Sequence, residues 1–154
     1  MTKLTREEIY KLRPDANIRP RGSGKQPQPQ ISYPGENGKR EQMPFVIPPD
    51  ELDALDRCVP RGQRSATVRD AVVRLAMRLG LVSKSPARLQ VERTAQVIGR
   101  DPDDLADELG VTGPQFRPSL RALAEAGKLY TRRGVPSESR AIRWAVKVFL
   151  AEHA

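Results

Sequence analysis

Apolar side chains recur at helical spacing through residues 49–80, behind a short stretch that favours a strand. Residues 43–48, MPFVIP, have strand propensity, and residues 49–59 open with a proline and two acids before apolar positions spaced three and four apart. Ser65 is expected to cap a second helix, which Gly80 ends. The side chains predicted to be buried are Phe45, Ile47, Leu52, Leu55, Val68, Val72 and Leu75.

The motifs IPxxxL, LD and RSxxVRDAV in residues 43–80 resemble the strand end, first helix and second helix of the ribbon-helix-helix fold. In that family two chains interlock and pair their strands in the major groove of DNA. A segment of about 40 residues with one strand buries too little surface to fold alone. We therefore expect residues 43–82 to form a homodimer that buries the seven residues above. Gln42 is the outward ribbon residue able to contact a base, and Arg61, Arg64 and the helix start at Ser65 are expected to hold a phosphate.

Two further helices are predicted between residues 101 and 127. Asp101 caps a helix with acids in its first turn, and Gly110 ends it. The next helix carries Phe116, Leu120, Leu123 and Ala124 on one face and ends at Gly127, and residues 128–133 indicate a short strand. The motifs LAxELGVT and xLxxLxxAGxL, followed by a basic hairpin, resemble winged helix-turn-helix DNA-binding domains. The resemblance implies that the second helix enters the major groove and that the wing lies along the backbone or minor groove.

Basic residues gather at this end of the chain, whereas acids gather at residues 101–108. Such segregation favours a nucleic-acid surface over a solvated face of mixed charge. Gln115 and Arg121 are expected on the outer side of the second helix and Arg117 on its flank, where they contact bases or are merely solvated. Arg132 and Arg133 are expected on phosphate or in a narrow minor groove, and Thr112 caps the helix or donates to a phosphate. Lys128 and Arg140 complete the predicted DNA-binding set.

The flanking segments are less regular. Residues 1–42 carry nine Lys and Arg against five Asp and Glu and are predicted to be a disordered tail, apart from a short helix with a Thr5–Glu8 capping box. This tail either adds phosphate contacts, binds a protein partner, or serves only solubility. Ser85 and Pro86 start a helix to about Ile98. Residues 140–154 fit a strand or a helix, and we favour a wing strand to about Trp144 followed by a short helix.

Composition limits the chemistry. The formal charge of +8 and the pI near 10.1 indicate either a chain that binds polyanions or a surface that serves only solubility. Cys58 is the only cysteine and is interpreted, with Trp144, as a core residue, and the lone histidine, His153, is expected to be solvated. No sequence motif indicates catalysis, a cofactor or a metal site. The sequence lacks a membrane span and a signal peptide, so a cytoplasmic, nucleoid-associated location is expected.

Together these features predict a mainly α protein in three parts: a basic tail at 1–42, a dimerisation module at 43–82 and a winged helix-turn-helix domain at 86–154. The predicted function is sequence-specific binding of double-stranded DNA at a two-fold or repeated site, as a dimeric repressor or a plasmid or phage replicon accessory factor. The alternative is a protein-interaction module or inhibitor that binds an acidic partner through a winged-helix scaffold. RNA binding ranks last, because few aromatic residues are present to stack on bases.

Overall fold

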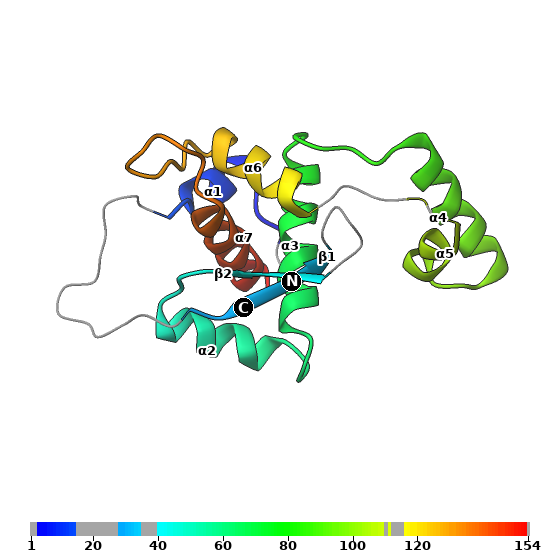
Figure 1. The fold of residues 1–154 in the computed structure, drawn as a ribbon, viewed down its shortest axis with the longest axis horizontal. Helices are drawn as coiled ribbons and strands as arrows, with labels where there is room; N and C mark the ends of the chain where they lie inside the picture. Colours follow the sequence, from blue (N-terminus) through cyan, green and yellow to red (C-terminus); the bar gives the residue numbers. More distant parts are fainter. Residues whose placement is uncertain (1–2, 15–27, 35–39, 110, 112–115, 154) are drawn as a thin grey trace.

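The computed structural model describes residues 3–14, 28–34, 40–109, 111 and 116–153. Within these ranges the chain is mainly helical with a small antiparallel sheet, which confirms the predicted fold class at that level. Figure 1 shows a body of helices and the sheet, with a helical arm projecting from one end. The elements in order are α1 (Arg6–Lys11), β1 (Gln30–Pro34), β2 (Arg40–Pro44), α2 (Pro49–Cys58), α3 (Arg64–Arg78), α4 (Pro86–Ile98), α5 (Pro102–Leu109), α6 (Phe116–Ala126) and α7 (Glu138–Glu152).

Most of the predicted helix starts are confirmed, because the expected side chains cap them. Thr5 and Glu8 form a reciprocal capping box at α1, and the Ser85 hydroxyl accepts a hydrogen bond from the N–H of Arg88 at α4. One Asp101 carboxylate oxygen accepts from the N–H groups of two residues at the start of α5. Ser65 is the exception. Helix α3 begins at Arg64 without a side-chain cap, and the Ser65 hydroxyl instead accepts from the N–H of Ser32 in β1.

Strands β1 and β2 form an antiparallel ribbon within one chain, with Ile31 opposite Met43 and Tyr33 opposite Glu41. Strand β1 and the start of β2 lie inside the segment predicted to be disordered, so that prediction is wrong for residues 30–34 and 40–42. Ile31 and Tyr33 are buried, and β1 packs against α3. The strand predicted at 43–48 ends at Pro44, although side chains beyond it still alternate, with Phe45 and Ile47 buried and Val46 exposed. Residues 15–27 and 35–39 of the predicted tail lie outside the described part.

Helix α3 is the centre of the body, because it packs against β1, α6 and α7. Six of the seven residues predicted to bury at a dimer interface are buried in the core of a single chain, and Leu52 packs against that core. The strand partner that was expected from a second copy is β1 of the same chain. This segment therefore does not need a second copy to pair its strand or cover its core, and homodimerisation stays a prediction. Residues on both sides of the predicted boundary at 82–86 share one core.

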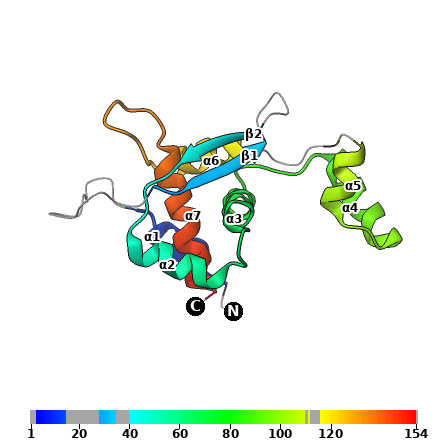
Figure 2. The same cartoon turned by 60° about the horizontal axis from the view of Figure 1, so that its bottom comes forward.

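The arm, residues 86–109, consists of α4 and α5, which pack chiefly on each other. Its small core contains Val91, Ala95, Leu105 and Ala106, with Val111 packed against it. Figures 1 and 2 both place the arm at the end of the molecule opposite the loop between α6 and α7. Helix α6 is packed on α3 and α7 instead.

Helix α7 corrects the prediction for the C-terminal segment. Residues 138–152 form one continuous helix, so the predicted wing strand to Trp144 is wrong. Trp144 is fully buried, as expected, and its indole Nε1–H donates a 2.8 Å hydrogen bond to the carbonyl oxygen of Ile9. This bond fixes α1 on the body, where Ile9 is also buried. The prediction that Cys58 is a core residue is wrong, because Cys58 is exposed at the end of α2.

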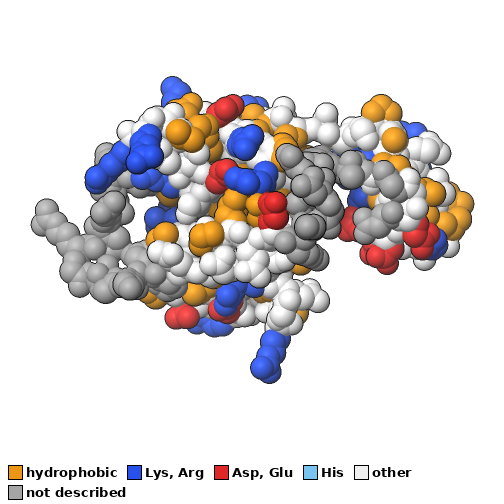
Figure 3. All heavy atoms as spheres, in the orientation of Figure 1, with side chains coloured by type: hydrophobic (Ala, Val, Ile, Leu, Met, Phe, Trp, Pro, Cys, Tyr) orange, Lys and Arg blue, Asp and Glu red, His pale blue; other side chains and the backbone are white. Residues whose placement is uncertain are grey.

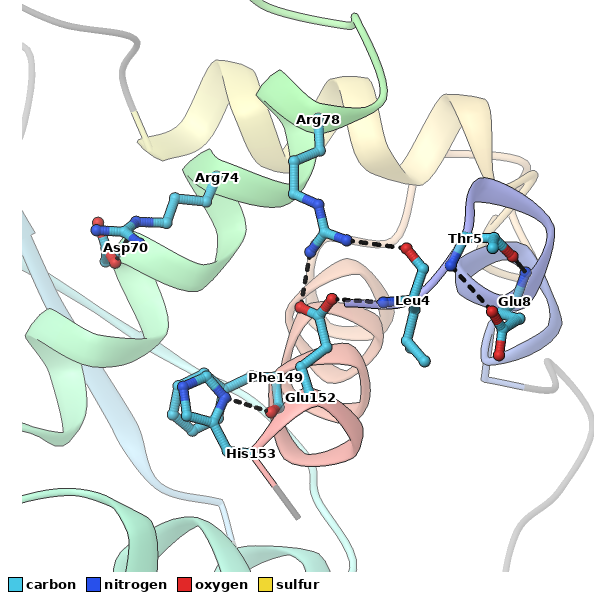
Figure 4. Close-up of polar contacts among 9 residues, drawn as sticks. All are labelled: Leu4, Thr5, Glu8, Asp70, Arg74, Arg78, Phe149, Glu152 and His153. Atoms are coloured by element: carbon cyan, nitrogen blue, oxygen red, sulfur yellow. Dashed lines mark hydrogen bonds and ion pairs between the residues drawn. The ribbon is translucent and has the colours of Figure 1, made fainter. Parts of the chain in front are cut away.

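A polar cluster ties the chain start to the ends of α3 and α7 (Figure 4). One Glu152 oxygen lies 2.7 Å from Nη1 of Arg78, and the other accepts a 2.9 Å bond from the N–H of Leu4. Arg78 also donates to the Leu4 carbonyl oxygen. Burial raises the pKa of Glu152, but the Arg78 hydrogen bond, the Leu4 N–H and the neighbouring positive charge together outweigh burial, so the pKa lies below its ordinary value of 4.5.

None of the helices in the described ranges has the length and apolar character that crossing a membrane requires.

Replacing Trp144 with Phe should destabilise the protein by about 2–4 kcal/mol, because it removes buried volume and the hydrogen bond to Ile9. A helix of six residues is unstable alone, so α1 should also become accessible to protease. Urea unfolding and limited proteolysis measure the two effects. Tyr130→Phe, at an exposed position, is the control and should change stability by less than about 0.5 kcal/mol. If the Trp144→Phe variant were as stable as wild type and its α1 still resisted protease, the role assigned to the Trp144–Ile9 hydrogen bond would be wrong.

The lowered pKa of Glu152 implies stability that depends on pH. A folded-state pKa below the unfolded value contributes stability that is present above the unfolded pKa and is lost as pH falls through the folded pKa. Glu152→Gln should therefore be less stable than wild type at pH 7, and the difference should shrink on acidification below about pH 4.5. Urea unfolding across this pH range measures it. Glu7→Gln, in an exposed pair with Lys11, should show little difference at any pH, and a difference for Glu152→Gln that is independent of pH would refute the role of the Glu152 charge.

Candidate nucleic-acid interface

The chain between α6 and α7 forms a tight hairpin. The N–H of Thr131 donates a 2.8 Å hydrogen bond to the carbonyl oxygen of Val135, and the N–H of Gly134 donates to that of Thr131. Gly134 has a φ of +77°, which a glycine adopts without strain, and this pattern is a four-residue turn closed by a left-handed residue. Arg132 and Arg133 occupy the two central positions of the turn. The hairpin has a single bridge, Tyr130 to Pro136, so the strand predicted at 128–133 is wrong.

The base of the hairpin is anchored in the core. A Cβ atom on Gly127 would lie 2.9 Å from Cζ3 of buried Trp144, so only glycine lets the chain pass this close to the indole ring. Leu129 is buried, and the N–H of Ser137 donates a 2.7 Å bond to its carbonyl oxygen. Arg13, which follows α1, donates from Nη1 to the carbonyl oxygen of Gly127. Helices at both ends and these contacts therefore fix the direction in which the hairpin projects.

Four cations are exposed on the hairpin or on α6, the helix that leads into it, and we name them together the hairpin surface: Arg121, Lys128, Arg132 and Arg133. Among the described residues none of the four side chains has an ion-pair or hydrogen-bond partner. Figure 3 shows Lys and Arg side chains gathered over this end of the molecule and acidic side chains over the arm. Unpaired cations held at a fixed site are what phosphate groups bind, because each neutralised phosphate releases counterions.

Two predicted DNA-contacting arginines are used inside the protein. Arg117 forms two hydrogen bonds to Glu138, of 3.1 and 2.8 Å, and lies over the Tyr33 ring. The hydrogen bonds to Glu138 outweigh burial and raise the pKa of Arg117. Arg140 donates to the carbonyl oxygen of Tyr130. Arg117 therefore ties α6 to α7 below the hairpin and Arg140 braces the hairpin itself, so both position the interface and neither is free to reach a base.

The remaining predicted contacts fall elsewhere. Thr112 and Gln115 lie outside the described residues. Gln42 is exposed on β2. Arg61, Arg64 and Ser65 line a concavity of about 480 Å³ at the turn between α2 and α3, away from the hairpin in Figures 1 and 2.

That concavity offers little free charge. Arg64 pairs with Asp56 through two hydrogen bonds of 2.8 and 2.7 Å, and this pairing raises the pKa of Arg64. The Ser65 hydroxyl is engaged by the N–H of Ser32. Arg61 is exposed and has no partner among the described residues. The structure does not bring these residues together with the hairpin surface.

Sequence analysis missed Tyr130 and Val135, which flank the turn arginines and are among the few large apolar side chains exposed on the described surface. The signal was present, because both lie beside the charged turn in a segment with no helical spacing. It also missed Arg13, since residues 1–42 were treated as a separate tail.

In the part of the chain that the structure describes, no cluster of His, Cys, Asp and Glu side chains is arranged to hold a metal ion. Comparison of the chain with protein-family models, characterised proteins and solved structures found no match.

Proposed function

We propose that this protein binds double-stranded DNA through the hairpin surface, chiefly by contacts to phosphate groups. The observation that supports this most directly is the pair of arginines at the centre of a rigid four-residue turn, with Arg121 and Lys128 exposed nearby and no described acid paired to any of them. A protruding hairpin can follow a groove or the backbone of a duplex.

Charge distribution supports the same proposal. The residues outside the arm carry a formal charge of +11, because the arm holds three arginines against six acids in a chain of +8. A surface that served only solubility would mix its signs evenly, whereas Figure 3 shows Lys and Arg over the hairpin end and acids over the arm, with both signs on the body between them.

The support for base reading is weaker. Arg117 is held by Glu138, and helix α6 uses its apolar face on α3 and α7. We therefore propose that phosphate contacts and DNA shape contribute more to binding than paired hydrogen bonds to base edges do. The resemblances to ribbon-helix-helix and winged-helix families, and the roles of repressor or replicon factor that they imply, stay predictions.

An acidic protein partner is the competing proposal, because Tyr130 and Val135 give the same surface two exposed apolar side chains. The two proposals differ in their dependence on salt. For duplex DNA, the logarithm of the binding constant falls linearly with the logarithm of the salt concentration, with a slope of about −0.9 for each phosphate neutralised.

Titration of random duplex DNA at several salt concentrations tests the proposal. Four phosphate contacts predict a slope between about −3 and −4, and Arg132→Ala should make it shallower by about one unit. Arg57→Ala, an exposed arginine on α2 with no described partner, has the same charge change and should leave the slope unaltered. Equal slopes for the two variants, or no binding at low salt, would refute DNA binding by this surface.

A further inference from the structure

The arm exposes more apolar surface than its size explains. Leu89, Val97, Ile98 and Leu109 are exposed, with 85% of Val97 accessible to solvent, and in the described residues only Val46, Tyr130 and Val135 are comparable. Its core has four residues, two of them alanines. A two-helix hairpin with so little buried surface gains stability when its outer face is covered.

Exposed apolar side chains at the end of α4 are close in the chain to the acids that begin α5. Val97 and Ile98 end α4, and Asp101, Asp103 and Asp104 follow three to six residues later, at the start of α5. Asp101 and Asp104 have no ion-pair partner among the described residues. Asp103 pairs with Arg88, yet 82% of its side chain is exposed. The turn between α4 and α5, which we call the tip of the arm, is therefore flanked in the chain by two exposed apolar side chains and three exposed acids, of which Asp103 reaches Arg88 near the start of α4.

The hairpin surface has the complementary composition. Tyr130 and Val135 are exposed on either side of Arg132 and Arg133, and Lys128 and Arg121 are close by in the chain. Both surfaces combine two exposed apolar side chains with charged ones, and the charges have opposite signs, which suits a contact between them.

The two surfaces cannot meet within one chain as it is folded, because the body lies between them. Figures 1 and 2 show the arm at one end of the molecule and the hairpin at the other. Pairing of two arms would bring two acidic tips together, and like charges oppose this. The occupant that fits each surface is the other surface on a second copy of the chain.

We propose that the tip of the arm in one molecule docks on the hairpin surface of another, which gives a head-to-tail contact between copies. The contact joins two different surfaces, so it leaves one arm and one hairpin surface free and adds further copies at higher concentration. It uses the cations proposed to bind DNA, so free protein would compete with DNA for them. Only this competition rests on the proposed function.

Sedimentation velocity of the full chain, without DNA, tests the contact. The average mass should rise with protein concentration at low salt and fall toward the monomer as salt screens the charges beyond a Debye length of about 8 Å at 0.15 M. Three variants should each weaken self-association roughly tenfold: Asp103→Ser with Asp104→Ser, Arg132→Gln with Arg133→Gln, and Val97→Ser. Val97 is so exposed that its replacement should leave folding intact, and circular dichroism checks this for all three.

Mixing the variants distinguishes this contact from other modes of pairing. The arm variant Asp103→Ser/Asp104→Ser retains an intact hairpin surface, and the hairpin variant Arg132→Gln/Arg133→Gln retains an intact arm. A mixture should therefore form a one-to-one dimer that grows no further, although each variant alone stays monomeric. Arg57→Gln with Arg61→Gln, which matches the hairpin variant in charge, should associate like wild type.

Three results would overturn the proposal: a wild-type protein that is monomeric at every concentration, a hairpin variant that associates like wild type, or a mixture that stays monomeric. The DNA titration is a separate measurement, so loss of DNA binding with intact self-association would refute the proposed function alone. Where both hold, duplex DNA should dissociate the assemblies, and assemblies that persist on DNA would refute the shared surface.

Discussion

The structure depends on the burial of one helix, α3, by segments from both halves of the chain. Its apolar residues Val68, Val72 and Leu75 meet β1 on one side and α6 and α7 on another. Burying such side chains stabilises the fold by about 1.5–3 kcal/mol each, and no single neighbour covers all of them. The same burial fixes α6 and α7 relative to each other, and the loop that joins them becomes a rigid hairpin because both of its ends are held. The candidate interface is therefore a consequence of the core and does not fold independently of it.

The sequence was sufficient to locate most helices, but it did not show which segments pack against one another. Spacing and caps located α1, α2, α4 and α5, because those signals lie within one turn of each helix end. The first part of α7 was predicted as a strand because it is buried at positions that fit both periods, among them Ile142, Trp144 and Val146, and burial of so wide a face removes the contrast that marks a helix. Strand β1 escaped because two buried side chains in a polar, proline-rich segment form no pattern. Their partner is α3, which meets the strand at Ser65, 33 residues beyond Ser32 in the chain.

The same limit applies to charges. The sequence located the basic end and the acidic segment correctly, since the segregation is visible in the order of residues. It could not show which arginines are neutralised, because Glu138 lies 21 residues beyond Arg117 and Asp56 lies eight residues before Arg64. Pairing removed these two arginines from the predicted set of free cations, and a carbonyl oxygen engages Arg140. Arg61, Arg121, Arg132 and Arg133 stay without a partner among the described residues, and the last two lie at the turn, where the chain reverses.

Duplex DNA and the arm of a second copy are the two proposed ligands of the hairpin surface, and their charges indicate which of them should bind it more tightly. A duplex presents one charge for about every 1.7 Å of its axis and releases condensed counterions on binding, whereas the tip of the arm offers three carboxylates, one of them already paired. The arm gains apolar contacts with Tyr130 and Val135, which DNA does not provide. Under the two proposals, duplex DNA would therefore occupy the hairpin surface in preference to a second copy of the chain at equal concentration. A second copy would occupy it only where DNA is scarce, or where salt has weakened the phosphate contacts more than the apolar ones. Under the two proposals, self-association would reduce weak, scattered binding more than binding to a long duplex, because a copy released from DNA would have its hairpin surface covered by another copy.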